Sequence, residues 1–174
     1  MPYLELTLNG RRLATGGADQ LDVLSLVLIA NRRSTQLSLQ LGGMRTLPDG
    51  RTEHLCWSRT LLQTDDQLRV AVFDKAVADQ LDTQLSSSIP LAQKLETPLR
   101  TLQFDVEFSD CERFSALATE DTLQLVASWL GGREGCKVDV DSISAAEDGT
   151  TQGRRWVERI VRPGEWFEVK PHLQ

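Results

Sequence analysis

Residues 23–30, with the sequence VLSLVLIA, form the longest apolar run of the chain. The run is too short to cross a bilayer as a helix. Alternate side chains of a strand point to opposite faces, and here both alternating sets are apolar except for Ser25. A strand of this kind needs cover on both faces, as a central strand of a sheet does. The β-branched content and the polar residues 31–33 that follow predict a strand rather than a buried helix segment.

The length and charge of the chain limit what it can be. Its 174 residues are enough for one domain or two small lobes with a buried core. A formal net charge of -6 at pH 7 argues against a surface that binds nucleic acid, and no segment is long enough to span a membrane. The three cysteines are an odd number at wide spacing, and the first residues lack the pattern of a secretory signal. We therefore expect a cytoplasmic protein with reduced thiols.

The first 74 residues predict a half built from strands alone. Residues 4–8 alternate leucine with polar residues, and Asn9-Gly10 after them is a strong signal for a two-residue hairpin turn. Further strands are predicted over residues 11–15, 23–30, 37–41, 52–57 and 68–73.

The hydrophobic pattern changes at residue 75. Val77, Leu81 and Leu85 recur every four residues, which predicts a short amphipathic helix that the serines and proline at 86–90 end.

This break suggests how the chain is divided. We expect a β-rich N-terminal lobe over residues 1–85, a crossover or linker over 86–98, and a C-terminal lobe over 99–174. Because the strand at 23–30 needs a second covering layer, we expect the two lobes to pack together.

The second half predicts the order β-α-β-β-β. After an alternating strand at 102–108, Ser109 and Glu112 fit a capping box, and an apolar stripe over 123–130 ends at Gly131-Gly132. We therefore expect one main helix near 110–130. Strands around 138–141 and in a hairpin over 156–169 complete a fold of the α+β class, β-rich, with a mostly antiparallel sheet or sandwich. We detect no internal repeat.

Histidine and cysteine supply the candidates for catalysis. His54 and Cys56 would share one face of a strand, where they could form a thiolate and its base or half of a metal site. No second ligand pair has metal spacing, and His172 lies near the chain end, so a packed cysteine beside an ordinary histidine is the interpretation we favour. Cys111 would have its pKa lowered at the start of the predicted helix, but a small buried residue is the favoured alternative there.

The acidic residues and the known motifs point to no cofactor. Asp139 and Asp141 alternate with valines, and Ile143 and Ser144 occupy places where a calcium loop needs an acid and a glycine. Phosphate-loop, dinucleotide-binding, nucleophile-elbow and zinc-protease motifs do not occur. We therefore assign no catalytic, cofactor-binding or metal-binding residue.

Tryptophan supplies the candidates for an interface. Trp57, Trp156 and Trp166 all fall on predicted strands. Tryptophan is favoured at interfaces because it buries a large area and keeps an N–H to satisfy, although for any single one of them a core position is the interpretation we favour.

Four patterns occur in the first 74 residues: Leu4-x-Leu6-x-Leu8-Asn9-Gly10, Gly42-Gly43, Thr52-Glu53-His54-Leu55-x-Trp57 and Leu62-x-x-x-Asp66-x-Leu68-x-Val70. They resemble a group of short uncharacterised bacterial β-rich proteins, which read GG, GEHL-x-W and L-x-x-GD-x-V at these places. Thr52 and Asp65 stand where that group has glycine. The resemblance implies a bacterial, cytoplasmic domain and brings no activity.

Together these observations favour a non-catalytic accessory protein that binds a protein partner or a second copy of itself. One alternative is a small enzyme or ligand-binding domain that uses His54 and Cys56, or Cys111. Another is an immunity-type inhibitor, which would share the small size and acidic charge.

Overall fold

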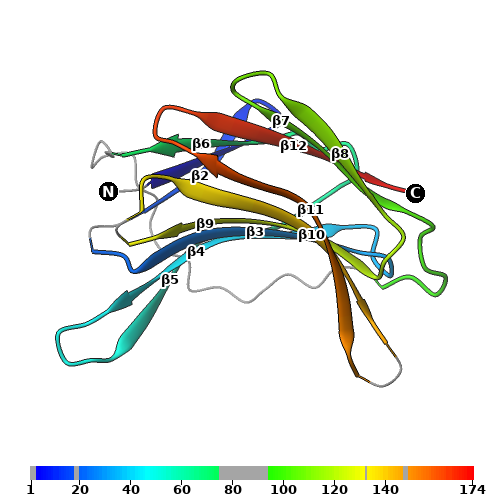
Figure 1. The fold of residues 1–174 in the computed structure, drawn as a ribbon, viewed down its shortest axis with the longest axis horizontal. Helices are drawn as coiled ribbons and strands as arrows, with labels where there is room; N and C mark the ends of the chain where they lie inside the picture. Colours follow the sequence, from blue (N-terminus) through cyan, green and yellow to red (C-terminus); the bar gives the residue numbers. More distant parts are fainter. Residues whose placement is uncertain (1–2, 18–19, 75–93, 132, 147–148) are drawn as a thin grey trace.

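The computed structural model describes residues 3–17, 20–74, 94–131, 133–146 and 149–174. In these ranges it contains twelve strands and no helix, and the strands form two antiparallel sheets of six that pack face to face (Figure 1). Sheet A has the order β2-β1-β6-β12-β7-β8, and sheet B the order β11-β10-β9-β3-β4-β5. The strands are β1 (Tyr3–Leu8), β2 (Arg11–Gly17), β3 (Val23–Asn31), β4 (Leu37–Thr46), β5 (Thr52–Leu62), β6 (Leu68–Phe73), β7 (Leu102–Phe108), β8 (Arg113–Ala118), β9 (Thr122–Leu130), β10 (Cys136–Ala145), β11 (Thr151–Val161) and β12 (Trp166–Leu173).

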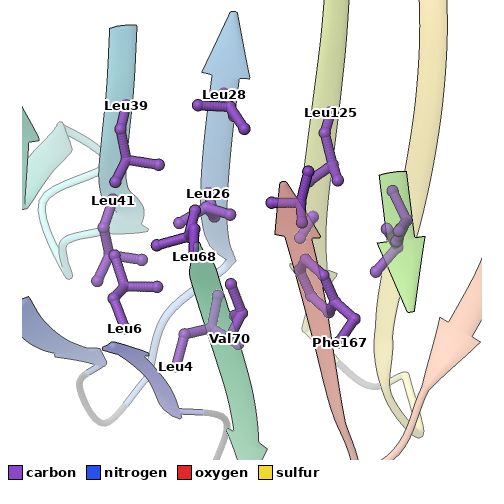
Figure 2. Close-up of a cluster of buried hydrophobic side chains, with 14 of the residues drawn as sticks. Leu4, Leu6, Leu26, Leu28, Leu39, Leu41, Leu68, Val70, Leu125 and Phe167 are labelled. Carbon is purple, nitrogen blue, oxygen red and sulfur yellow. The ribbon is translucent and has the colours of Figure 1, made fainter. Parts of the chain in front are cut away.

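The predicted strand at residues 23–30 is confirmed as β3, which lies at the centre of sheet B between β9 and β4. Its four inward side chains are fully buried, whereas the outward ones from Val23 to Ile29 are half-buried. Figure 2 shows Leu26 and Leu28 of β3 in the layer of side chains between the sheets, where Leu68, Val70 and Phe167 come from sheet A. Side chains of two antiparallel sheets that interdigitate in this way form the core of a β-sandwich.

The expected helix near 110–130 is wrong, and with it the α+β class: the described chain is all-β. Residues of the supposed capping box form the hairpin turn between β7 and β8 instead. Cys111 has a φ of +67°, and its N–H donates to the Phe108 carbonyl (2.8 Å), while the Phe108 N–H donates to the Glu112 carbonyl (2.9 Å). A serine and a glutamate three residues apart suit a polar turn as well as a helix start.

The apolar stripe predicted to be helical belongs to β9. Leu123, Leu125, Ala127 and Trp129 alternate along it and point into the core. The segment satisfied both a helical and a strand period, and its backbone groups pair with β3 on one side and β10 on the other. Gly131 caps no helix, because its N–H donates to the Asp22 carbonyl (2.8 Å).

The helix predicted over residues 75–85 lies outside the described residues, as does most of the boundary at 86–98. Of that boundary, Lys94 pairs with Ser34 in a short β-bridge, and the Leu95 N–H donates to the Arg33 carbonyl (2.7 Å). The six strands before it and the six after it each contribute three strands to sheet A and three to sheet B.

The two halves repeat the same topology, although no repeat was evident in the sequence. Strands β1 to β6 correspond in order to β7 to β12. When each strand is replaced by its counterpart, the strand order of each sheet is simply reversed. The central pairs, β6 with β12 and β3 with β9, are antiparallel. An approximate two-fold axis therefore passes between the halves.

The correspondence extends to irregularities of the backbone. A β-bulge between β4 and β5 leaves Trp57 as the extra residue, and a bulge between β10 and β11 leaves Trp156 in the same place. Two hydrogen bonds cross the axis reciprocally: the Asp65 N–H donates to the Pro171 carbonyl and the Gly164 N–H to the Val72 carbonyl, both at 2.8 Å. Such a repeat is hard to read in sequence, because hydrophobic class and backbone geometry are kept more often than residue identity.

Candidate functional site

The outer faces of the two sheets differ in character. Side chains on the outer face of sheet A are mostly charged or polar, as expected for the wet face of an antiparallel sheet; they include Glu5, Arg69, Asp105, Glu107, Glu168 and Lys170. At the centre of sheet B the outward side chains include Val23, Val27, Ile29 and Val126. No described strand covers this face, and the hairpins β4–β5 and β10–β11 extend beyond it on opposite sides (Figure 1).

Two adjoining hollows lie on this outer face over β3, β4 and β5, which we call the β3–β5 face. The larger hollow has a volume of about 500 Å³ and is lined by residues that include Met44, His54 and Cys56. The smaller has a volume of about 230 Å³ and is mostly apolar, with Val27, Ile29 and Leu61 in its wall. Gln40 and Arg59 line both, and so stand at the junction of the two hollows.

Arg59 is the unusual side chain of this surface. Its Nε is buried and has no hydrogen-bond partner among the described residues, and none of the described ion pairs includes it. A buried donor without an acceptor costs about 1–3 kcal/mol, and more when the group is charged. A cation left in this condition at the edge of two open hollows suits an acceptor that comes from another molecule.

The equivalent position in the second half holds an acid whose charge is paired. Glu158 follows the bulged Trp156 by two residues, as Arg59 follows Trp57. Its carboxylate contacts Lys137 (3.1 Å) and Arg155 (2.6 Å). The hydrogen bond from Lys137, with smaller contributions from Arg155, holds the pKa of Glu158 below its ordinary value.

The partners of Glu158 have no charged counterparts beside Arg59. Cys56 directly precedes the bulge of the first half, in the place that Arg155 occupies in the second half. Ser38 of β4 is in the position that Lys137 occupies on β10. The two halves thus share a backbone, but among the described residues Glu158 has charged partners and Arg59 has none.

His54 and Cys56 lie on the outward face of β5, where both line the larger hollow. No described hydrogen bond joins them, and the Cys56 Sγ contacts the Ser58 carbonyl (3.7 Å) instead. Cys111 lies exposed in the β7–β8 turn rather than at a helix start, so no helix dipole acts on its thiol. Among the described residues no group of three or more His, Cys, Asp or Glu is placed to hold a metal ion.

The three candidate tryptophans do not come together on one surface. Trp57 is only 5% exposed and belongs to the core. Trp156 is half-buried, donates from Nε1 to the Ser142 Oγ (3.0 Å) and carries the Arg154 guanidinium 3.8 Å from its ring centre. Trp166 begins β12 of sheet A, where the Arg69 guanidinium lies 4.1 Å from its ring centre.

A second polar cluster lies around His172 on sheet A. Its Nδ1 is 2.9 Å from an Asp65 oxygen and its Nε2 is 2.9 Å from an Asp105 oxygen. Burial raises the pKa of Asp105, but hydrogen bonds from Ser115, Gln103 and His172 together outweigh that effect and leave it below its ordinary value. Because both ring nitrogens contact carboxylates, this histidine has no nitrogen left to activate the Ser115 hydroxyl, and we interpret the cluster as structural.

Sequence reasoning missed Arg59. Counting along the strand from His54 and Cys56 would place Arg59 on the inward face with Trp57, and only the bulge at Trp57 turns it outward. That count carries no information on its neighbours, which come from β3 and β4.

The cysteines differ enough in exposure for thiol labelling to test the alternative that one is a reactive nucleophile. We expect a thiol reagent at neutral pH to modify Cys111 readily, Cys56 more slowly, and Cys136 only on unfolding. Burial raises the pKa of the Cys136 thiol to about 12 from 9.0, which makes its thiolate roughly a thousandfold rarer. Mass spectrometry of timed samples gives the three rates, and a Cys56 that reacts faster than Cys111 would favour the enzyme alternative.

Within the described ranges no helix has the length and apolar character needed to cross a membrane. No protein-family model, curated protein or solved structure matches the chain.

Proposed function

We propose that this chain is a non-catalytic interaction protein that binds a segment of a partner protein on its β3–β5 face. The observation that carries the proposal is the group of outward apolar side chains, including Val27 and Ile29, on a sheet face that no described strand covers. A solvated sheet face is normally polar, as the outer face of sheet A is. Contiguous apolar surface with a polar margin is characteristic of protein-binding sites.

The sizes and chemistry of the hollows favour a peptide segment over other ligands. A volume of about 230 Å³ is below the range of roughly 300–1,000 Å³ typical of small-molecule pockets, and it suits one side chain. The net charge of -6 works against nucleic acid. Among the described residues, His54 and Cys56 show no hydrogen bond of the kind that would activate a thiol.

The approximate two-fold axis supplies a matched pair of variants to test this proposal. Ile29 faces outward on β3, and Ser128 occupies the equivalent position on β9. The test uses peptides selected against the full chain from a phage-displayed random library. These peptides should bind the Ile29→Glu variant about tenfold to a hundredfold more weakly than wild type, because burial of the Ile29 side chain contributes about 1.5–3 kcal/mol to binding. Ser128→Glu should bind within about twofold of wild type, since Ser128 lines neither of the two hollows.

Calorimetric titration of each variant measures the affinities, and circular dichroism verifies its fold. Three outcomes would contradict the proposal: selection that enriches no peptide, equal weakening by both variants, or a crosslinker at position 29 that joins only residues 75–93 of the same chain. A dimer that dissociates on Ile29→Glu would replace the peptide with a second copy as the occupant.

A further inference from the structure

We infer that Arg59 binds a carboxylate, and that this carboxylate is the C-terminal group of a partner segment ending in an aliphatic residue. The inference rests on the proposed function, because it names the chemistry that the β3–β5 face recognises.

The charge of the site requires an anion from outside the described residues. The buried Nε of Arg59 has no acceptor within the described ranges, whereas the carboxylate of Glu158, its equivalent, pairs with Lys137 and Arg155. A guanidinium binds a planar carboxylate through charge-assisted hydrogen bonds, which are about twice as strong as neutral ones. Ser38 and Cys56 stand where the counter-charges would be, so no described residue at these positions supplies the acceptor, and we assign it to a ligand.

The arrangement of the hollows selects the kind of carboxylate. Arg59 and Gln40 lie at the junction, so an anion bound there sits at the entrance of the smaller hollow, whose wall includes Val27, Ile29 and Leu61. A C-terminal residue carries its carboxylate and its side chain on the same Cα, and it can place one on Arg59 and the other in the apolar hollow. An Asp or Glu side chain ends in the carboxylate itself and would leave this hollow empty.

The larger hollow accounts for the rest of the segment. It adjoins the same two residues and is open, with polar groups from Gln40 and His54 in its lining. The residues that precede the C-terminus can cross it and find donors and acceptors for their backbone. The β3–β5 face therefore binds a terminal carboxylate, the aliphatic side chain of the same residue, and the short stretch of chain that precedes that residue.

A matched pair of small probes tests the carboxylate directly. N-acetyl-leucine should shift the Arg59 Nε–H signal and the Val27 and Ile29 methyl signals in heteronuclear NMR spectra of the full chain. N-acetyl-leucinamide, which has the same side chain and no charge, should leave the Arg59 signal in place. An equal response to both probes, or no response to the acid, would overturn the inference.

Peptide binding then distinguishes the source of the carboxylate. An eight-residue peptide selected on the β3–β5 face and ending in leucine should lose about tenfold to a hundredfold in affinity when its C-terminus is amidated. Arg59→Gln should weaken the free acid by the same factor and make acid and amide equal. Arg51→Gln is the control, because that side chain is 78% exposed and pairs with Asp49 at the tip of the β4–β5 hairpin.

Failure of the inference can be told from failure of the proposed function. If the peptides lose affinity for Ile29→Glu but bind equally well as acid and as amide, the inferred carboxylate recognition is wrong. The proposed peptide-binding role of the β3–β5 face would still stand. If N-acetyl-leucine binds as tightly as the peptide, the ligand is a free aliphatic acid and the C-terminal assignment is wrong. A wild-type thermal transition in Arg59→Gln verifies that a lost signal reflects the site rather than unfolding.

Discussion

Replacing Phe167 with alanine is expected to lower the free energy of unfolding by about 3–5 kcal/mol, which is a large part of the stability of a domain this size. Phe167 lies on β12 beside the approximate two-fold axis, is fully buried, and packs with its ring centre 6.3 Å from that of Phe108. Its neighbours come from both halves, since β12 pairs with β6 and β7. The resulting cavity cannot be filled by the movement of one element alone.

Urea denaturation followed by tryptophan fluorescence measures this loss. Phe73→Ala is the matched control, because Phe73 has the same side chain on the neighbouring strand but is 40% exposed, and its removal should cost no more than about 1 kcal/mol. Equal losses at both positions would mean that the core does not extend across β6 and β12 as described.

Replacing Trp57 with alanine should also cost about 3–5 kcal/mol. The indole lies in the core at the bulge of β5, and a Cβ added to Gly16 of β2 would come within 2.9 Å of its Cδ2. This contact joins the edge of sheet B to the edge of sheet A, so its loss should loosen that side of the sandwich.

The equivalent residue makes this prediction specific. Trp156→Ala should cost roughly half as much or less, because Trp156 is half-buried at the same bulge of the other half. Thermal unfolding by circular dichroism gives both values. Trp57→Ala could instead leave stability unchanged and reduce partner binding. That result would show that Trp57 is an interface residue, as one interpretation of the sequence suggested, and that its assignment to the core is wrong.

The two halves differ at the surface where we propose that the function lies. Both halves retain the same strand order, bulges and reciprocal hydrogen bonds, which is what a stable sandwich requires. They differ in the outward residues beside the bulges, where the second half has a paired cluster around Glu158 and the first has Arg59. Outward residues are free to diverge because they carry little of the packing energy.

Much of the strand content follows from local pattern. In the first 74 residues, the alternation of leucines and the Asn9-Gly10 turn predicted strands and a hairpin that the structure contains. The segment at 122–130 was misassigned, because its apolar residues fit both a helical stripe and an alternating strand. Only pairing with β3 and β10 decides between these two periods.

The sequence by itself determined that residues 23–30 form a central strand with two apolar faces, since alternation along a chain is a local property. Tertiary structure decided what meets each face: sheet A covers Leu26 and Leu28, while Val27 and Ile29 remain at the β3–β5 face. It also decided that Arg59 has no described counter-charge, because the residues around it come from strands distant in sequence. Periodicity can be counted along one strand, whereas the pairing of a charge depends on which strands lie beside it.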